Sequence, residues 1–299
     1  SVRRGFADLF SASKAALDEI QAGLGGILPS MPGMPVAKFG DLSIGIDMHP
    51  TQDIYAAMCC QGGDLVIRKL DNNNDISRVK LDSKLSGGVE NCVWSESGSQ
   101  LMVTTYSPAS LYVFDVNGTL IKSLPSTHTS PGYGATWLSE TDVACGYQDG
   151  LVKIYNIPSA TQTWSYKLNG PYAWGMDTLN STQLLVGDYS GSVYNINWCT
   201  QQVVWTKPNW HSSHCRCLKL NKSKQLMLTG SCEYYVRLMK VDDQSKIWEH
   251  KLNSYVNGLV WVPGESYVLA LSYSNLLVAI DTKSGNRLYE YNQLSSWTC

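Results

Sequence analysis

The chain has 299 residues, with 23 Lys and Arg against 25 Asp and Glu, and a formal net charge of -2 at pH 7. This balance excludes a general attraction to polyanions, so direct nucleic-acid binding is not expected. No apolar run approaches the roughly 18 residues that a membrane-spanning helix needs, so no transmembrane segment is expected. The nine cysteines show no framework spacing, which predicts free thiols in an intracellular compartment, cytoplasmic or nuclear.

Residues 1–40 predict an amphipathic helix followed by a proline-rich tether. Gly25, Gly26 and then Pro29, Pro32 and Pro35 end the helical pattern. Three roles fit such a helix: packing on its own domain, docking into a partner's groove, or peripheral contact with a membrane surface. Arg3 and Arg4 favour the membrane surface, whereas the acidic residues of the same segment oppose it. The apolar stripe of the helix consists of Phe6, Phe10, Leu17, Ile20 and Leu24.

Residues 41–299 form the second predicted domain, and they contain an internal repeat of six units between residues 42 and 292. Three columns of equivalent positions recur at steps of 41 to 46 residues. The columns are Met48, Trp94, Trp137, Thr178, Leu220 and Trp261; Leu65, Leu111, Val152, Val193, Val236 and Val278; and Trp164, Trp205, Trp248 and Tyr289. A repeat of this length must be recognised before any local assignment, because it decides the fold.

Each unit contains short apolar runs at period 2, separated by Gly, Ser, Asn and Asp, which predict four short strands. Gly146, Gly187 and Gly230 recur at the end of the second strand, where a side chain is expected to obstruct the approach to the next turn. A four-stranded sheet cannot bury both of its faces alone, so the units must pack radially. The sequence therefore predicts an all-β fold, a β-propeller with six detectable blades and room for a seventh.

The repeat resembles that of the WD-repeat family. His128 and His211 match the family's histidine before the first strand, and Asp149 matches its turn acid, with Tyr155 in the place of the family's Trp. In the fifth unit, His211, Thr229 and Glu233 occupy the positions of the family's polar network. No Trp-Asp dipeptide is present, and Phe114-Asp115 comes closest, so the chain is a degenerate member on this reading.

The last unit is also similar to the repeat of quinoprotein-type propellers. The residues that carry this second resemblance are Ala279, Asp281, Ser284, Gly285 and Tyr289. It implies, as an alternative of another class, an oxidoreductase that binds a quinone cofactor. The chain otherwise lacks phosphate-binding loops and nucleophile motifs, so we expect no catalytic residues, no cofactor and no metal. The closely spaced His211, His214, Cys215 and Cys217 lack the separated pairs of a tetrahedral site.

The ends of the repeat are compatible with three ways of closing the ring. Six blades can close directly, or a partner can complete an open ring in trans, as in the propellers of vesicle coats and nuclear-pore scaffolds that this layout resembles. An uncovered blade edge exposes backbone donors and acceptors, which proteins usually cover. A seventh, unrecognised blade is the third alternative.

The WD-repeat resemblance also implies a binding face. In that family the residue four before the first-strand column lines the central channel, and the residue before the turn acid faces the same side. These positions hold Ile44, Glu90, Tyr133, Trp174, Arg216 and Asn257, and Gln148, Tyr189, Cys232 and Ser274. Tyr, Trp and Arg dominate binding hot spots. We therefore expect a non-enzymatic scaffold that binds other protein subunits of a complex through this face.

Overall fold

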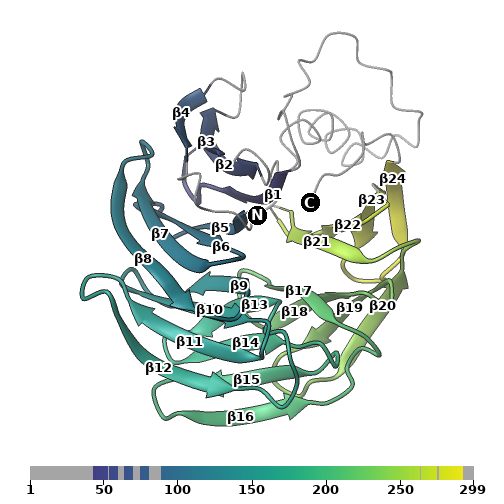
Figure 1. Ribbon diagram of the computed structural model, residues 1–299. Coiled ribbons are helices and arrows are strands. Elements are labelled where there is room, and N and C mark those ends of the chain that lie inside the picture. The colour runs from purple at the N-terminus through teal and green to yellow at the C-terminus, as the bar shows by residue number, and fades with distance from the viewer. Residues whose placement is uncertain are drawn as a thin grey trace.

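The computed structural model describes residues 43–52, 54–59, 64–69, 75–80, 89–262, 264–274 and 276–291. The predicted N-terminal helix, with Phe6, Phe10, Leu17, Ile20 and Leu24, lies outside the described residues. Over the described ranges the chain forms six four-stranded antiparallel sheets, arranged as blades around a centre (Figure 1). This arrangement confirms the predicted all-β propeller with four strands in each blade.

The blades follow one another along the chain. Blades 1 to 3 consist of β1 (Ser43–Met48), β2 (Ile54–Cys59), β3 (Asp64–Lys69) and β4 (Asp75–Lys80); β5 (Val89–Trp94), β6 (Gln100–Thr105), β7 (Ala109–Asp115) and β8 (Leu120–His128); and β9 (Gly132–Trp137), β10 (Asp142–Tyr147), β11 (Leu151–Asn156) and β12 (Thr161–Lys167). Blades 4 to 6 consist of β13 (Met176–Asn180), β14 (Gln183–Gly187), β15 (Val193–Asn197) and β16 (Gln202–Lys207); β17 (Cys215–Leu220), β18 (Leu226–Ser231), β19 (Tyr235–Lys240) and β20 (Lys246–Lys251); and β21 (Val256–Trp261), β22 (Tyr267–Ser272), β23 (Leu277–Asp281) and β24 (Arg287–Tyr291).

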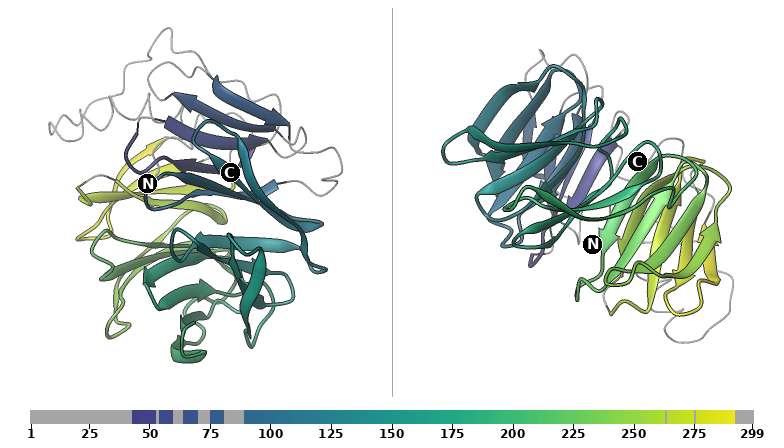
Figure 2. Two further views of the ribbon diagram at one scale, coloured as in Figure 1. Left: turned by 90° about the vertical axis from the view of Figure 1, so that its left-hand side faces the viewer. Right: turned by 90° about the horizontal axis from the view of Figure 1, so that it is seen from below.

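Within every sheet the strands pair in chain order, so each blade is one continuous stretch of sequence. The first strand of each blade lies near the centre and the fourth lies at the periphery, as Figures 1 and 2 show. The first strands pack against one another in the order β1, β5, β9, β13, β17 and β21. Among the described strands, β21 and β1 pack against each other less extensively than the neighbouring first strands do. A seam therefore lies between blade 6 and blade 1.

The first-strand column connects neighbouring blades. The indole Nε1 of Trp137 donates to the carbonyl of Val93 in blade 2 at 2.9 Å, and the hydroxyl of Thr178 donates to the carbonyl of Trp137 at 2.6 Å. Trp261 makes the equivalent bond to blade 5. Large rings recur in this column because each can fill the space between two sheets. The N–H groups of Trp137 and Trp261 also bond a carbonyl of the preceding blade, whereas Nε1 of Trp94 has no hydrogen-bond partner among the described residues.

The recurring glycines mark the places where adjacent blades approach most closely. A Cβ atom on Gly187 would lie 2.6 Å from the Sγ of Cys215, and one on Gly146 would lie 2.3 Å from the carbonyl oxygen of Ala173. Both obstructing residues belong to the innermost segment of the next blade. The prediction that a side chain would not fit is confirmed. The obstruction comes from the next blade, whereas the sequence had indicated the next turn.

The predicted polar network of blade 5 is present. Nδ1 of His211 lies 2.6 Å from a carboxylate oxygen of Glu233, and Nε2 lies 2.8 Å from the hydroxyl of Thr229. A carboxylate can only accept, so Nδ1 donates to Glu233 and Nε2 accepts from Thr229. His128, at the end of β8 in blade 2, and Asp149 of blade 3 form the corresponding pair at 2.8 Å. Over the described residues, no helix is long and apolar enough to cross a membrane.

Candidate functional site

A β-bulge in the first strand carries four of the residues that are predicted to line the central channel, and we refer to the predicted end of the channel as the channel mouth. In β5, Val89 pairs with Thr105 and Asn91 pairs with Thr104, so Glu90 is an extra residue without a cross-strand partner. A bulge bends the strand locally and redirects the side chain of the extra residue. The same register shift occurs in three other first strands, at Ile44, Arg216 and Asn257.

Aromatic side chains of blades 2 to 5 meet on the same face, and we refer to them as the aromatic cluster. The ring of Tyr133 lies 4.7 Å from that of Trp174, and Tyr189 lies 3.7 Å from His214, measured between centroids. Tyr172 joins the two pairs, at 5.1 Å from Tyr133 and 5.2 Å from Tyr189. The cluster consists of Tyr106, Tyr133, Tyr172, Trp174, Tyr189 and His214.

Two polar side chains predicted for the binding face are fixed against this cluster. The guanidinium of Arg216 lies 4.5 Å from the ring centroid of Trp174 and forms a hydrogen bond with Cys232. The amide Nε2 of Gln148 donates to the hydroxyl of Tyr172 at 2.9 Å. The structure therefore brings together five of the predicted residues: Tyr133, Gln148, Trp174, Tyr189 and Arg216.

Glu90 faces this group from blade 2. Burial raises the pKa of its carboxyl to about 8, although the positive charge of Arg216 acts in the opposite direction. Burial, and then Arg216, lower the pKa of His214, while burial raises the pKa of Tyr133 well above its usual range. At neutral pH, Arg216 is therefore the main charged group of the channel mouth, and Glu90 is largely protonated.

Asn257 and Ser274 lie apart from the aromatic cluster. The hydroxyl of Ser274 donates to the side chain of Asn253 at 2.7 Å, within the loops of blade 6. Asn257 occupies the bulge of β21, where its Oδ1 is buried without a hydrogen-bond partner among the described residues. Among the described residues, no hydrogen bond or ring contact joins either residue to the aromatic cluster, so their place on the binding face stays a prediction.

Several aromatic residues of this face were missed in the sequence. Tyr172 and His214 each lie two residues before a predicted channel residue, Trp174 and Arg216. Their rings lie 6.0 and 6.1 Å from the ring of Trp174. Extending the predicted column by one such step would have found both. Three further tyrosines, Tyr234, Tyr255 and Tyr273, form a second aromatic group over blades 5 and 6, with centroids 5.5 and 6.0 Å apart.

Comparison with known proteins agrees with the geometry of the blades. No family model matches the chain. A relative from Arabidopsis thaliana, WD repeat-containing protein 55, is 26% identical over 163 residues. The chain resembles the WD-repeat β-propellers. The matched segment covers 52% of this chain and 45% of the relative, so the likeness extends over about half of either protein.

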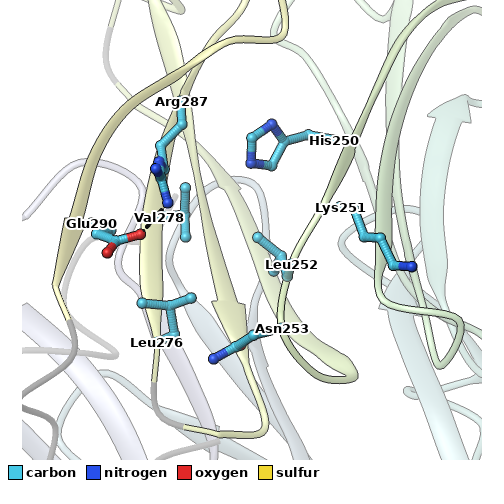
Figure 3. A pocket seen from close by; sticks show the side chains of 8 residues that line it. All are labelled: His250, Lys251, Leu252, Asn253, Leu276, Val278, Arg287 and Glu290. Atoms are coloured by element: carbon cyan, nitrogen blue, oxygen red, sulfur yellow. Dashed lines mark hydrogen bonds and ion pairs between the residues drawn. The ribbon is translucent and has the colours of Figure 1, made fainter.

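A hollow of about 360 Å³ lies outside the channel mouth of this WD-repeat-like propeller, between β20 and the outer strands of blade 6 (Figure 3). Arg287 and Glu290 form an ion pair beside it, and Nδ1 of His250 lies 3.0 Å from the carbonyl of Gly285. The ammonium of Lys251, which also lines the hollow, lies 5.5 Å from the ring centroid of Tyr235, so the charged side chains of the hollow already have partners. Among the described residues, no group of three or more His, Cys, Asp or Glu side chains could hold a metal ion.

Proposed function

We propose that the protein is a non-catalytic interaction scaffold, a subunit of a multi-protein assembly that binds a partner protein on the channel-mouth face. The aromatic cluster is the observation that carries this proposal. Its rings are not needed to fill the sheets, because Tyr189 is 43% exposed and the rings of Tyr133, Tyr172 and Trp174 are only partly buried. Exposed aromatic side chains gathered on one face are typical of protein-binding surfaces.

The chemistry of the cluster favours a protein partner. Tyr and Trp bury a large area while keeping a polar group for orientation, and Arg adds directional donors. Here the three types are already held against one another, since Arg216 stacks on Trp174 and Gln148 holds Tyr172. Such preorganisation lowers the entropy that binding must overcome. Loops on a rigid propeller can provide this surface without changing the core.

The test is partner capture by a double variant, Trp174→Ala with Tyr133→Ala. Affinity capture from the native cell, followed by mass spectrometry, first identifies the partner of the wild-type chain. We expect the double variant to bind this partner at least about tenfold more weakly, because hot-spot aromatics contribute about 2 kcal/mol or more each.

The matched control is Val204→Ala with Ile247→Ala on the outer strands β16 and β20. These side chains are exposed, at 50% and 41%, and belong to strands at the periphery of the disc. Capture should stay at the wild-type level in this control. A folded channel-mouth variant that captures the partner as well as the wild type does would refute the proposed face.

A further inference from the structure

Two hydrogen-bond acceptors at the channel mouth lack a partner. No hydrogen bond or ion pair engages the carboxyl of Glu90 within the described part of the chain, and Oδ1 of Asn257 is buried and equally unpartnered. Both residues are the extra residue of a first-strand bulge, in β5 and β21, and so lie at the same level of the channel. Buried polar groups are nearly always satisfied, so the bare Oδ1 of Asn257 points to a missing donor. The carboxyl of Glu90 is half-buried and can accept a bond from the same incoming group.

Arg216 does not supply this donor. Its guanidinium stacks on Trp174 at 4.5 Å and is hydrogen-bonded to Cys232. It acts on Glu90 only through space, and its charge does not offset the burial of that carboxyl. The channel mouth thus contains a carboxyl whose charged form still needs a direct counter-ion.

The wall between Glu90 and Arg216 is aromatic, formed by Tyr133 of blade 3 and Trp174 of blade 4. Tyr106 and Tyr172 extend this wall around Tyr133, with ring centroids at 5.5 and 5.1 Å. Aromatic ring faces attract cations by about 0.5–2 kcal/mol. The unpartnered acceptors therefore favour a positively charged group, and so do the aromatic ring faces.

We propose that the channel mouth receives a basic side chain, lysine or arginine, from the partner protein, with Glu90 as its counter-ion and Asn257 as a second acceptor. This inference rests on the proposed function and specifies the chemistry of the partner. The inserted cation lies along the ring of Tyr133, on the side of the channel mouth away from Arg216.

Binding at this site must depend on pH. The groups that face Glu90 are Arg216, which is always charged, and Tyr133, which stays neutral because burial raises its pKa. His214, next to Arg216, is neutral above pH 6.5 because burial lowers its pKa. Glu90 alone therefore changes charge between pH 6.5 and 8.5, and a bound cation favours its ionised form. Affinity for a cation rises across this window, and binding at pH 7 releases a proton.

The experiment is an NMR titration of the full chain with three probes: N-acetyl-arginine methylamide, its lysine counterpart, and the citrulline analogue, which has the shape of arginine without the charge. We expect both cationic probes to bind with weak, about millimolar affinity, and citrulline not to bind. The affinity of the cationic probes should be roughly twenty-five-fold higher at pH 8.5 than at pH 6.5, in proportion to the ionised fraction of Glu90.

Three variants make the test specific. Glu90→Gln should abolish the pH dependence and weaken the cationic probes at least about fivefold, and it keeps the shape of the neutral acid, so the fold is retained. Asn257→Asp should strengthen their binding, because it adds a carboxylate to the same bulge position. Glu96→Gln, at an exposed turn at the other end of β5, should change nothing.

Equal binding of citrulline, or unchanged binding in a folded Glu90→Gln variant, would overturn the assignment of a basic side chain. This failure is distinguishable from failure of the scaffold proposal. If the Trp174 and Tyr133 double variant still loses the partner, the channel-mouth face binds it through other chemistry. If that variant captures the partner normally, the face itself is wrong.

Discussion

Thr229 holds the polar network of blade 5 together from the interior of β18. Its hydroxyl accepts a hydrogen bond from Nε1 of Trp210 and donates to Nε2 of His211, both at 2.8 Å. Burial lowers the pKa of His211, and the imidazole therefore stays neutral and can accept this bond. Burial alone would raise the pKa of Glu233, but hydrogen bonds from His211, Ser212 and Arg237 hold it well below its usual range.

Replacing Thr229 by valine should destabilise the protein by about 2–4 kcal/mol, because two buried polar groups lose their partner at about 1–3 kcal/mol each. Valine has nearly the same shape as threonine, so packing is preserved. Urea unfolding measures the difference. Thr229→Ser keeps the hydroxyl and should lose much less, and equal losses in the two variants would show that the hydroxyl does not matter.

Glu90 gives a second prediction at the level of one residue, and it concerns stability. Its pKa rises from 4.5 to about 8 on folding, so the folded state binds the extra proton and stability falls as pH rises from about 4.5 to 8. The histidines whose pKa values are lowered, His49, His211, His214 and His250, act in the opposite sense only below about pH 6.5.

Between pH 6.5 and 8.5 the wild type should therefore lose stability relative to Glu90→Gln, by up to a few kcal/mol. Thermal melts of both proteins at several pH values measure this gap. A gap that stays constant over the window would show that Glu90 is ionised throughout. Above pH 8.5 the gap should stop growing, because Glu90 is then charged in both the folded and the unfolded state.

At the scale of the strand, the approach between adjacent blades depends on glycine at the end of the second strand. Gly187→Ala would place a methyl group 2.6 Å from the Sγ of Cys215 and 2.9 Å from its carbonyl oxygen. Because the backbone of β17 cannot move without displacing blade 5, we expect a loss of about 2 kcal/mol or more in unfolding free energy.

Gly264→Ala provides the matched control. Gly264 has a φ of 84° and nothing within 4 Å of the position of a Cβ atom, so alanine should cost only about 1–2 kcal/mol of backbone strain there. Chemical denaturation of the two variants separates steric obstruction from strain. A Gly187→Ala variant that is no less stable than the control would mean that blades 4 and 5 can separate at little cost.

The elements were predictable from the sequence to different degrees. The strands and the blade boundary at β24 (Arg287–Tyr291) follow from period-2 alternation and from the repeat, which average over many residues. The bulges do not, because an extra residue such as Glu90 or Arg216 leaves no local composition signal. The family resemblance placed the channel column, which stays a prediction, whereas the unpaired state of Glu90 and the contacts of Tyr172 and His214 needed coordinates.

On the scale of the whole molecule, all strands of the described sheets begin at or after Ser43. Deletion of residues 1–40 should therefore leave the propeller folded, with a melting temperature within about 2–4 °C of the full chain, which corresponds to less than about 1 kcal/mol. Circular dichroism on heating measures this. Collapse of the shortened protein would place the predicted N-terminal helix in the core.

The same deletion bears on partner binding. If the helix is a second attachment point, the shortened chain should capture the partner more weakly while retaining the cation dependence of the channel mouth. Both effects can be measured on one preparation. Loss of cation binding together with the helix would contradict the separation of the two attachment points.

Every blade is a single uninterrupted stretch of the chain. Each strand thus meets its partner within a few residues, and loop closure within a blade costs little entropy. As the polypeptide leaves the ribosome, one sheet after another can form before the next has been synthesised. The order of translation then matches the order of assembly around the ring, with each complete blade docking onto the one before it.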